Sequence, residues 1–485
     1  MKKTLPAICL FVILLLLLGA CGPKTNAVPA TVTAKSAAQA TAVSTQETAS
    51  DTSAMPAPPS NAAGGAPPGS GTGSSNVETA LASATGAYTL DGGNATETGQ
   101  AYTASNTDQS GVYVTNGGVL TLNNVTVTTS GNTSSDENSS FYGLNAGVLA
   151  AAGSQVTING GAISTIGTGA NGAFATGSGS SVTLTDVTIN ATGDGGHGVM
   201  VTQGGAVTLN NVVMTTSGAH SAPIATDRGS GVITTTGGSV TTSGQDSPCY
   251  YSTGVLTISG NTCSSTGSEI AVIEGANSIV LVDTTASTSV ANKWAIMIYQ
   301  SMSGDAKGTE GTFTMTGGSL AFTAASGPLF FVTDSTGLIT LKGVQVTVAS
   351  GMLVEAGGTD RWGTSGSNGG TVIFTADGQT LTSNMVADSL SSLTVTLQNG
   401  SALTGAINSE GTAQAVNLTL DASSTWTVTA DSYLTSVSDA DGISETTITN
   451  IIGNGHIVYY DASACPELGD LTYTLTGGGS LQPLK

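Results

Sequence analysis

Five side chains that could perform chemistry lie between residues 194 and 228. The segment Gly193-Asp-Gly-Gly-His-Gly198 contains Asp194 and His197, and it is followed by His220, Asp227 and Arg228. Two carboxyl groups about 6.5–9.5 Å apart can act as acid and base when a glycosidic bond is hydrolysed with inversion. One hypothesis is therefore a carbohydrate-active enzyme, a polysaccharide hydrolase or lyase, that uses these five residues.

A turn position explains the same histidine more simply. Gly169-Ala-Asn-Gly172 precedes Gly195-Gly-His-Gly198 by one repeat, so His197 stands where the earlier repeat has Asn. Pectin-hydrolysing enzymes of similar repeat architecture also contain Gly-His-Gly, but their paired Asp residues and basic substrate-binding tripeptide are missing here. The Lys and Arg residues that a lyase would need are scattered. We therefore commit to no catalytic residue.

Metal binding is a second hypothesis for the same segment. His197 and His220 are 23 residues apart and have only loosely placed carboxylates near them in the sequence, at Asp194, Asp227 and Asp246. Zinc sites have defined ligand spacings, and none is present here. We expect no metal and no cofactor.

Two longer segments offer binding chemistry instead. The sequence is built from short repeats, described below, and residues 299–312 and 356–371 are insertions at the same place in two of them. The two repeats are two steps apart, so we expect both insertions on the same edge of the fold. Aromatic rings with a few polar neighbours can stack on sugar faces. The alternative is that these loops only cover the edge and that Trp294 packs inside. The predicted ligand-binding residues are Trp294, Tyr299, Asp305, Lys307, Asp360, Arg361 and Trp362.

These residues must be positioned by a short repeat that runs through most of the chain. It reads Leu120-Thr-Leu-Asn-Asn-Val-Thr-Val127, and later Val182-Thr-Leu-Thr-Asp-Val-Thr-Ile189. Apolar and polar residues alternate strictly, which indicates strands, and the Asn, Asp or Gly between them suits a turn of positive φ. The first apolar residue of each repeat serves as a marker, and most steps between markers are 21–26 residues. The twelve markers are Leu120, Val156, Val182, Val207, Ile233, Leu256, Ile279, Phe313, Ile339, Val372, Leu393 and Leu418.

Repeats of this length predict a solenoid, because one repeat cannot bury its apolar row alone. We expect an all-β fold, a single-stranded right-handed parallel β-helix of about twelve or more turns, with three short strands in each turn. Thr follows the marker in ten of the twelve repeats, and Val280 and Ile373 interrupt this outward column. A flat Thr array could bind ice, but these breaks and Lys342 argue against that function.

The repeat over about residues 110–420 resembles the right-handed β-helix proteins of bacterial surfaces. The segment Ala422-Ser-Ser-Thr-Trp-Thr-Val-Thr-Ala-Asp-Ser-Tyr433 resembles the closing strands of pertactin-like adhesin passenger domains. We expect no membrane barrel after Lys485. The resemblance implies adhesin-like binding of surfaces or glycans without catalysis, with a passive envelope protein as a further alternative. The scaffold itself does not define an activity.

The start of the chain predicts its location. Met1-Lys-Lys3 is basic, residues 8–18 are apolar, and Leu18-Gly-Ala-Cys21 resembles the lipoprotein cleavage pattern. The resemblance implies a signal peptide over 1–20, lipidation of Cys21, and a bacterial cell-envelope location facing outward. Acyl chains on Cys21 would make the membrane a partner. Residues 21–76 are rich in Ala, Thr, Ser, Pro and Gly and indicate a flexible tether. The β-helix then occupies 77–485, with a cap over 77–110 and closing turns over 421–485.

Charge excludes one class of partner. The formal net charge is −21, and removal of Lys2 and Lys3 with the signal peptide makes it −23. So acidic a chain is unsuited to nucleic acid. We also expect the protein to be a monomer.

Cys249 and Cys263 fall within one repeat, but spacing alone does not show whether they are bridged. Unbridged thiols packed in the core are the favoured interpretation.

Overall fold

The computed structural model describes residues 80–439 and 441–484. The predicted signal peptide over 1–20, the lipidation site Cys21 and the tether over 21–76 lie outside the described residues. The same holds for residues 77–79 of the predicted cap. Among the residues that are described, no helix is both long enough and apolar enough to cross a membrane.

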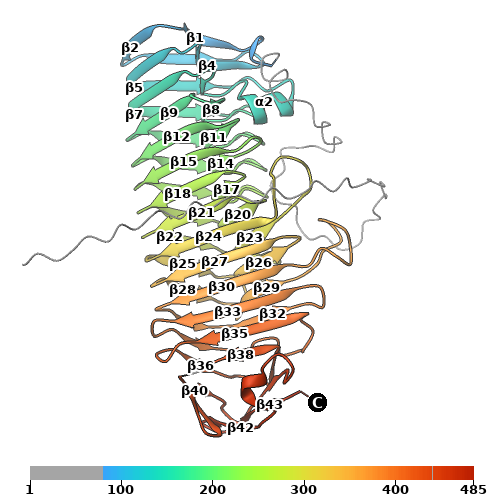
Figure 1. Ribbon diagram of the computed structural model, residues 1–485. Helices are drawn as coiled ribbons and strands as arrows, with labels where there is room; N and C mark the ends of the chain where they lie inside the picture. Colours follow the sequence, from blue (N-terminus) through green and yellow to red (C-terminus); the bar gives the residue numbers. More distant parts are fainter. Residues whose placement is uncertain (1–79, 440, 485) are drawn as a thin grey trace, which may run out of the picture. The chain divides into compact units, whose positions relative to one another are not determined.

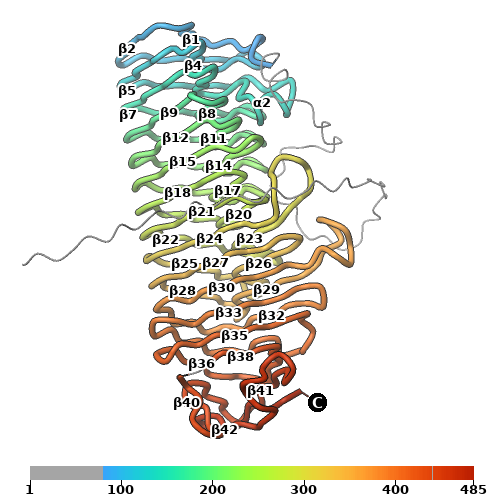
Figure 2. Tube along the Cα trace, in the orientation of Figure 1, coloured from blue at the N-terminus to red at the C-terminus, as the bar shows by residue number. Residues whose placement is uncertain are grey.

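The chain forms a parallel β-solenoid of about 16 turns that begins at residue 85. Successive turns stack strand upon strand, as Figures 1 and 2 show. One turn consists of β11 (Val199–Thr202), β12 (Gly205–Asn210) and β13 (Val213–Thr216), and each pairs in parallel with its counterparts in the turns before and after. The predicted parallel β-helix is confirmed.

The strands belong to three sheets. Sheet A holds the first strand of each turn: β1 (Thr85–Asp91), β4 (Gln109–Thr115), β6 (Val148–Ala150), β8 (Ala173–Thr176), β11, β14 (Ile224–Thr226), β17 (Tyr250–Ser252), β20 (Ala271–Glu274), β23 (Ile296–Tyr299), β26 (Phe330–Thr333), β29 (Met352–Ala356) and β32 (Asn384–Ala387).

Sheet B holds the second and third strands. The second strands are β2 (Asn94–Thr98), β5 (Val119–Thr129), β7 (Gln155–Thr165), β9 (Ser181–Thr185), β12, β15 (Gly231–Thr236), β18 (Val255–Ser259), β21 (Ser278–Val282), β24 (Glu310–Thr316), β27 (Thr336–Lys342), β30 (Thr371–Asp377), β33 (Ser392–Gln398), β35 (Ala415–Leu420) and β38 (Ser436–Ser438). The third strands are β3 (Ala101–Ala104), β10 (Thr188–Ala191), β13, β16 (Ser239–Thr242), β19 (Thr262–Ser265), β22 (Thr285–Thr288), β25 (Ser319–Phe322) and β28 (Gln345–Val348), while β5 and β7 extend into this position as well.

Sheet C, one short α-helix and one 3₁₀ turn complete the elements that are named within the described residues. Antiparallel pairs β39–β40 and β42–β43 appear only towards the end of the chain, where the regular stacking gives way. The elements are β31 (Thr380–Thr382), β34 (Ala402–Thr404), β36 (Thr425–Thr427), β37 (Ser432–Leu434), β39 (Ile443–Ser444), β40 (Thr447–Ile452), β41 (Ile457–Tyr460), β42 (Tyr473–Thr476), β43 (Ser480–Pro483), the helix α2 (Asp136–Tyr142) and the 3₁₀ turn η1 (Pro466–Leu468).

Every second side chain of a strand points into the solenoid, and these side chains fill its interior. In β12 every second residue is buried, and Val207 and Leu209 point inward while Thr208 faces outward. The turn between the second and third strands has positive φ, as predicted: Asn211 has φ of 52° and Asp186, one turn earlier, has φ of 55°. The Asn211 amide donates to the Asp186 carboxylate at 2.7 Å, so these turns also stack.

The observed register corrects two markers. Ile339 pairs with Phe374 rather than Val372, and Leu418 pairs with Val395 rather than Leu393. Because side chains alternate with a period of two, Val372 and Leu393 still face the interior. Ile373 therefore does not interrupt the Thr column: Thr340 pairs with Thr375, and Thr375 pairs with Thr396. Only Val280 breaks this column between residues 121 and 419.

From β6 to β26, sheet A is buried on both faces. Its inward side chains join the main core, and its outward ones form a second apolar cluster that contains Phe174, Met200 and Met297. Helix α2 and the long loops after β23 and β29 project on the same side of the solenoid (Figure 1). Trp362, from the loop after β29, belongs to this second cluster. The insertions therefore cover the outer face of sheet A.

The two cysteines of one turn are joined. Cys249 and Cys263 form a disulfide with a sequence separation of 14 residues, and both lie in the main core. The interpretation as unbridged thiols is therefore wrong for this pair. Cys465 is a buried free thiol.

Candidate functional site

The candidate site lies on the outer face of sheet A, where β14, β17, β20 and β23 end. Tyr251 pairs with Val272, and Glu274 pairs with Tyr299 in the next turn. The same register places Asp227, directly after β14, and Thr253, directly after β17, level with Glu274. Four consecutive turns therefore contribute a polar outward side chain at one position: Asp227, Thr253, Glu274 and Tyr299.

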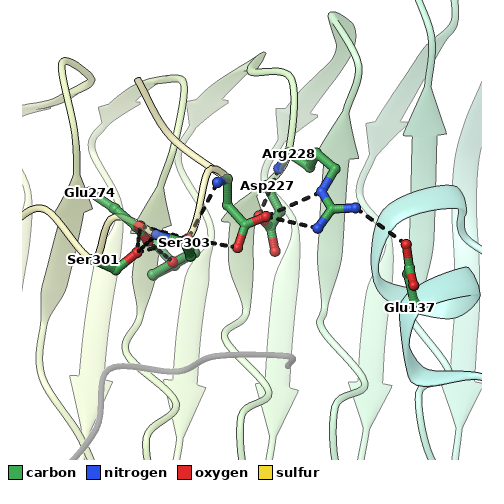
Figure 3. Close-up of polar contacts among 8 residues, drawn as sticks. Glu137, Asp227, Arg228, Glu274, Ser301 and Ser303 are labelled. Carbon is green, nitrogen blue, oxygen red and sulfur yellow. Dashed lines mark hydrogen bonds and ion pairs between the residues drawn. The ribbon is translucent and has the colours of Figure 1, made fainter. Parts of the chain in front are cut away.

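Glu274 holds the loop after β23 against the sheet. Its Oε2 accepts hydrogen bonds from the hydroxyls of Tyr251, at 2.7 Å, and Tyr299, at 2.8 Å. Its Oε1 accepts from Ser301, and from Ser303 at 3.4 Å. Figure 3 shows Ser301 and Ser303 beside Glu274. Burial and the nearby Glu274 charge raise the pKa of both tyrosines, so these phenols remain protonated donors.

Arg228 joins two insertions. Its guanidinium donates to Asp305 in the loop after β23, at 3.0 Å and 3.2 Å, and to Glu137 of α2 at 3.3 Å. It also lies over the ring of Phe141 at 3.7 Å from the centroid. Figure 3 shows Arg228 reaching towards Glu137. One cation therefore fixes α2 and the distant loop over sheet A.

Asp227 is the unusual acid of the group. It is 5% exposed, and its Oδ1 accepts the backbone N–H of Arg228 at 2.7 Å. Burial raises the pKa of Asp227 well above its usual range, and the Asp305 charge raises it further. A carboxyl group in this state holds its proton at higher pH than an exposed Asp and can donate it.

The predicted aromatic residues also meet here. The Trp294 ring stacks on Phe331 with centroids 4.4 Å apart, and Trp362 packs edge-on against Trp294 at 6.3 Å and Tyr299 at 5.3 Å. Trp294 is 3% exposed and Trp362 4%. The expectation of exposed stacking rings is therefore wrong, and so is the alternative that Trp294 enters the interior of the solenoid, because it packs outside sheet A.

The remaining loop residues are at the surface. Lys307 and Asp360 are exposed. Arg361 is exposed as well and lies 5.1 Å from the Trp362 ring. These polar residues accompany the covered aromatic cluster.

Asp194, His197 and His220 lie elsewhere. His197 and His220 precede β11 and β14, so they stand at the opposite end of the sheet A strands from Asp227. His197 is buried, and both its backbone N–H and its Nδ1 lie 3.0 Å from the Asn171 amide oxygen. Asp194 is exposed and accepts the backbone N–H of Ala219 at 2.8 Å. These are corner contacts between turns.

The five candidate residues of the enzyme hypothesis, none of which was committed to a catalytic role, therefore separate. Asp227 and Arg228 join Tyr299 and Asp305 from the other predicted group, while the remaining three form the corner. Burial, and to a smaller extent the nearby His220, lower the pKa of His197 to about 3, so the imidazole is neutral at ordinary pH. A buried neutral imidazole held by Asn171 is a structural group.

Sequence reasoning missed Glu274, Tyr251 and Glu137. The sequence carried one signal for the first: Glu274 and Tyr299 both end a sheet A strand. Sheet A is apolar on both faces, however, so the sequence does not show which side chains point outward.

Within the described part of the chain, no group of three or more His, Cys, Asp or Glu is arranged to hold a metal ion.

Comparison with models of known protein families and with curated proteins gave no match. A function for this chain is therefore inferred from the geometry of the described residues and from its sequence.

Proposed function

We propose that this protein is an adhesin-like β-helix of the bacterial cell surface that binds glycans or other surfaces without catalysis. The observation that carries the proposal is the regular Thr column on the second strands of sheet B. The column includes Thr121, Thr157, Thr183, Thr208, Thr234, Thr257, Thr314, Thr340, Thr375, Thr396 and Thr419.

This column suits an extended ligand. Paired strands are spaced by about 4.8 Å, so the hydroxyl groups repeat at that interval. Thr hydroxyls both donate and accept hydrogen bonds, which matches the hydroxyl groups of a glycan. The charged groups near sheet A, by contrast, are already engaged: Asp305 binds Arg228, and Glu274 accepts from four hydroxyls.

A binding assay with matched variants tests the proposal. Thr234→Lys and Thr257→Lys together place bulky charges in the column, and retention of the purified chain on a glycan array or matrix panel should fall at least tenfold. Thr241→Lys is the control, because Thr241 is an exposed outward residue of the third strands. Failure of the wild-type chain to bind any surface, or equal loss in the control, contradicts the proposal.

We also propose that the chain is lipid-anchored through Cys21 and faces outward from the envelope. The lipoprotein-like pattern before Cys21 supports this location. Many molecules anchored in one membrane would present many copies of the same binding surface. Such multivalency strengthens contacts that are individually weak.

One observation favours an alternative, a glycan hydrolase at sheet A. Asp227 and Glu274 stand at the same position two turns apart, roughly 10 Å along the solenoid, close to the carboxyl separation of inverting enzymes. Asp227 with its raised pKa would be the acid and Glu274 the base. Asp227→Asn should abolish polysaccharide degradation if this alternative holds, whereas binding by the Thr column would be unchanged.

A further inference from the structure

A buried lysine lies between two carboxylates beside the second apolar cluster. Lys293 Nζ is 2.5 Å from Asp246 Oδ1 and 3.5 Å from Glu269 Oε1. Lys293 is 5% exposed, Asp246 2% and Glu269 0%. The three residues come from the turns directly before β17, β20 and β23, which are consecutive along the solenoid.

This arrangement is costly as a set of charges. Charged groups that are buried lose their hydration, and pairing them recovers only part of that cost. Glu269 Oε2 accepts a hydrogen bond from Ser268, but Glu269 Oε1 has no hydrogen-bond partner although it is buried. It points towards the amine and is free to accept a proton.

We propose that Lys293 and Asp246 form an intramolecular amide bond, with Glu269 as the proton-transfer group. This inference is independent of the binding function proposed above. The product replaces an ammonium and a carboxylate by a neutral amide, which removes two of the three buried charges.

The step balances without any further reactant. Lys293 transfers a proton to Asp246 Oδ1, which leaves a neutral amine and a carboxylic acid. The amine lone pair attacks Cγ of Asp246, and the C=O electron pair moves to Oδ2. Gln245 stabilises the resulting charge, because its Nε2 donates to Oδ2 at 3.3 Å. Oδ2 then becomes the amide oxygen.

Collapse of this intermediate needs Glu269. Glu269 Oε1 takes a proton from the nitrogen and passes it to Oδ1 as the Cγ–Oδ1 bond breaks, so that one water molecule leaves. Glu269 ends as it began, a carboxylate. Direct contact between the reacting groups replaces a bimolecular encounter, and the dry site disfavours the reverse hydrolysis.

The bond would connect turns that otherwise interact only through their neighbours. Asp246 and Lys293 are 47 residues apart, with the Glu269 turn between them. In a solenoid each turn contacts mainly the next, so a link across three turns resists local separation of the stack.

Mass spectrometry of the intact purified protein tests the inference. After reduction of the disulfide, the wild-type chain should be lighter by one water molecule than the mass calculated for its processed sequence with any lipid on Cys21 included. Cleavage after Glu residues should then leave residues 138–269, which contain Asp246, joined to residues 275–310, which contain Lys293. Lys307→Arg, a change at an exposed lysine of the neighbouring loop, should keep the link.

Glu269→Gln and Lys293→Arg should both have the full mass and separate fragments. Glu269→Gln keeps the size of the side chain but cannot accept the proton. A wild-type chain of full mass with separate fragments overturns the inference and leaves only an ion pair. A link that persists in Glu269→Gln overturns the role of Glu269, and one that persists in Lys293→Arg overturns the assignment of the amine.

Discussion

His197 gives the sharpest test of how this solenoid is held together. The imidazole occupies a buried corner and interacts with Asn171, which fills the equivalent corner one turn earlier. His197→Asn should therefore be accommodated, because the preceding turn already uses Asn at this place. The substitution removes a titratable group while leaving a hydrogen-bonding side chain in the corner.

The expected effect depends on pH. An unfolded histidine binds a proton near pH 6.5, whereas the folded protein keeps His197 neutral until its pKa of about 3. Protons therefore favour the unfolded chain between these values, and wild-type stability falls as pH decreases. The loss is about 1.4 kcal/mol per pH unit, or about 2.7 kcal/mol at pH 4.5 relative to pH values above 6.5.

Urea denaturation from pH 7.5 to pH 4.5, followed by tryptophan fluorescence, measures this loss. The difference in unfolding free energy between His197→Asn and wild type should move in favour of the variant by about 2.7 kcal/mol over that range. Carboxyl groups titrate equally in both proteins and cancel in the difference. His456→Asn is the control, because His456 is partly exposed near Asp431 and lies outside the buried corner.

Two results would refute the reasoning. Parallel pH curves for wild type and His197→Asn would show that burial of this imidazole has no proton-linked cost. An NMR titration in which the His197 ring protonates near pH 6.5 in the folded protein would show that the corner is open to a charged ring.

Four further predictions concern covalent links, burial and anchoring. Replacing Cys249 and Cys263 by Ala should lower the unfolding free energy by about 3 kcal/mol, the chain-entropy value for a loop of about 15 residues, and unchanged urea midpoints would contradict this. Asp227→Asn should raise the melting temperature at pH 7, since a carboxyl group with a raised pKa costs stability as pH rises above its unfolded value, and a lower melting temperature would contradict it. Asp305→Asn should lower the pKa of Asp227 by removing a nearby negative charge, as measured by carboxyl NMR titration; an unchanged pKa would refute the coupling. Cys21→Ser should move the protein from the membrane fraction to the soluble fraction and abolish acyl labelling, and retention at the membrane would refute lipid anchoring.

The candidate site could be predicted only in part. Asp227, Arg228, Tyr299 and Asp305 could be selected from the sequence, but in two separate groups. Their union depends on a loop that returns over sheet A, so that Arg228 meets Asp305 77 residues later. No local pattern specifies where such a loop settles.

The sequence alone determined the solenoid. Apolar residues alternate with polar ones and turn residues recur at fixed places, which indicates short strands, and such strands can bury their apolar face only if successive repeats stack on one another. A strand that is shifted by two residues against its neighbour keeps the same alternation. The register of the strands after Ile339 could therefore be established only from the structure. Tertiary structure also decided which side chains of sheet A face outward, since both of its faces are apolar. The site arose from that choice: outward carboxyls and phenols were buried only when α2 and the loops closed over them.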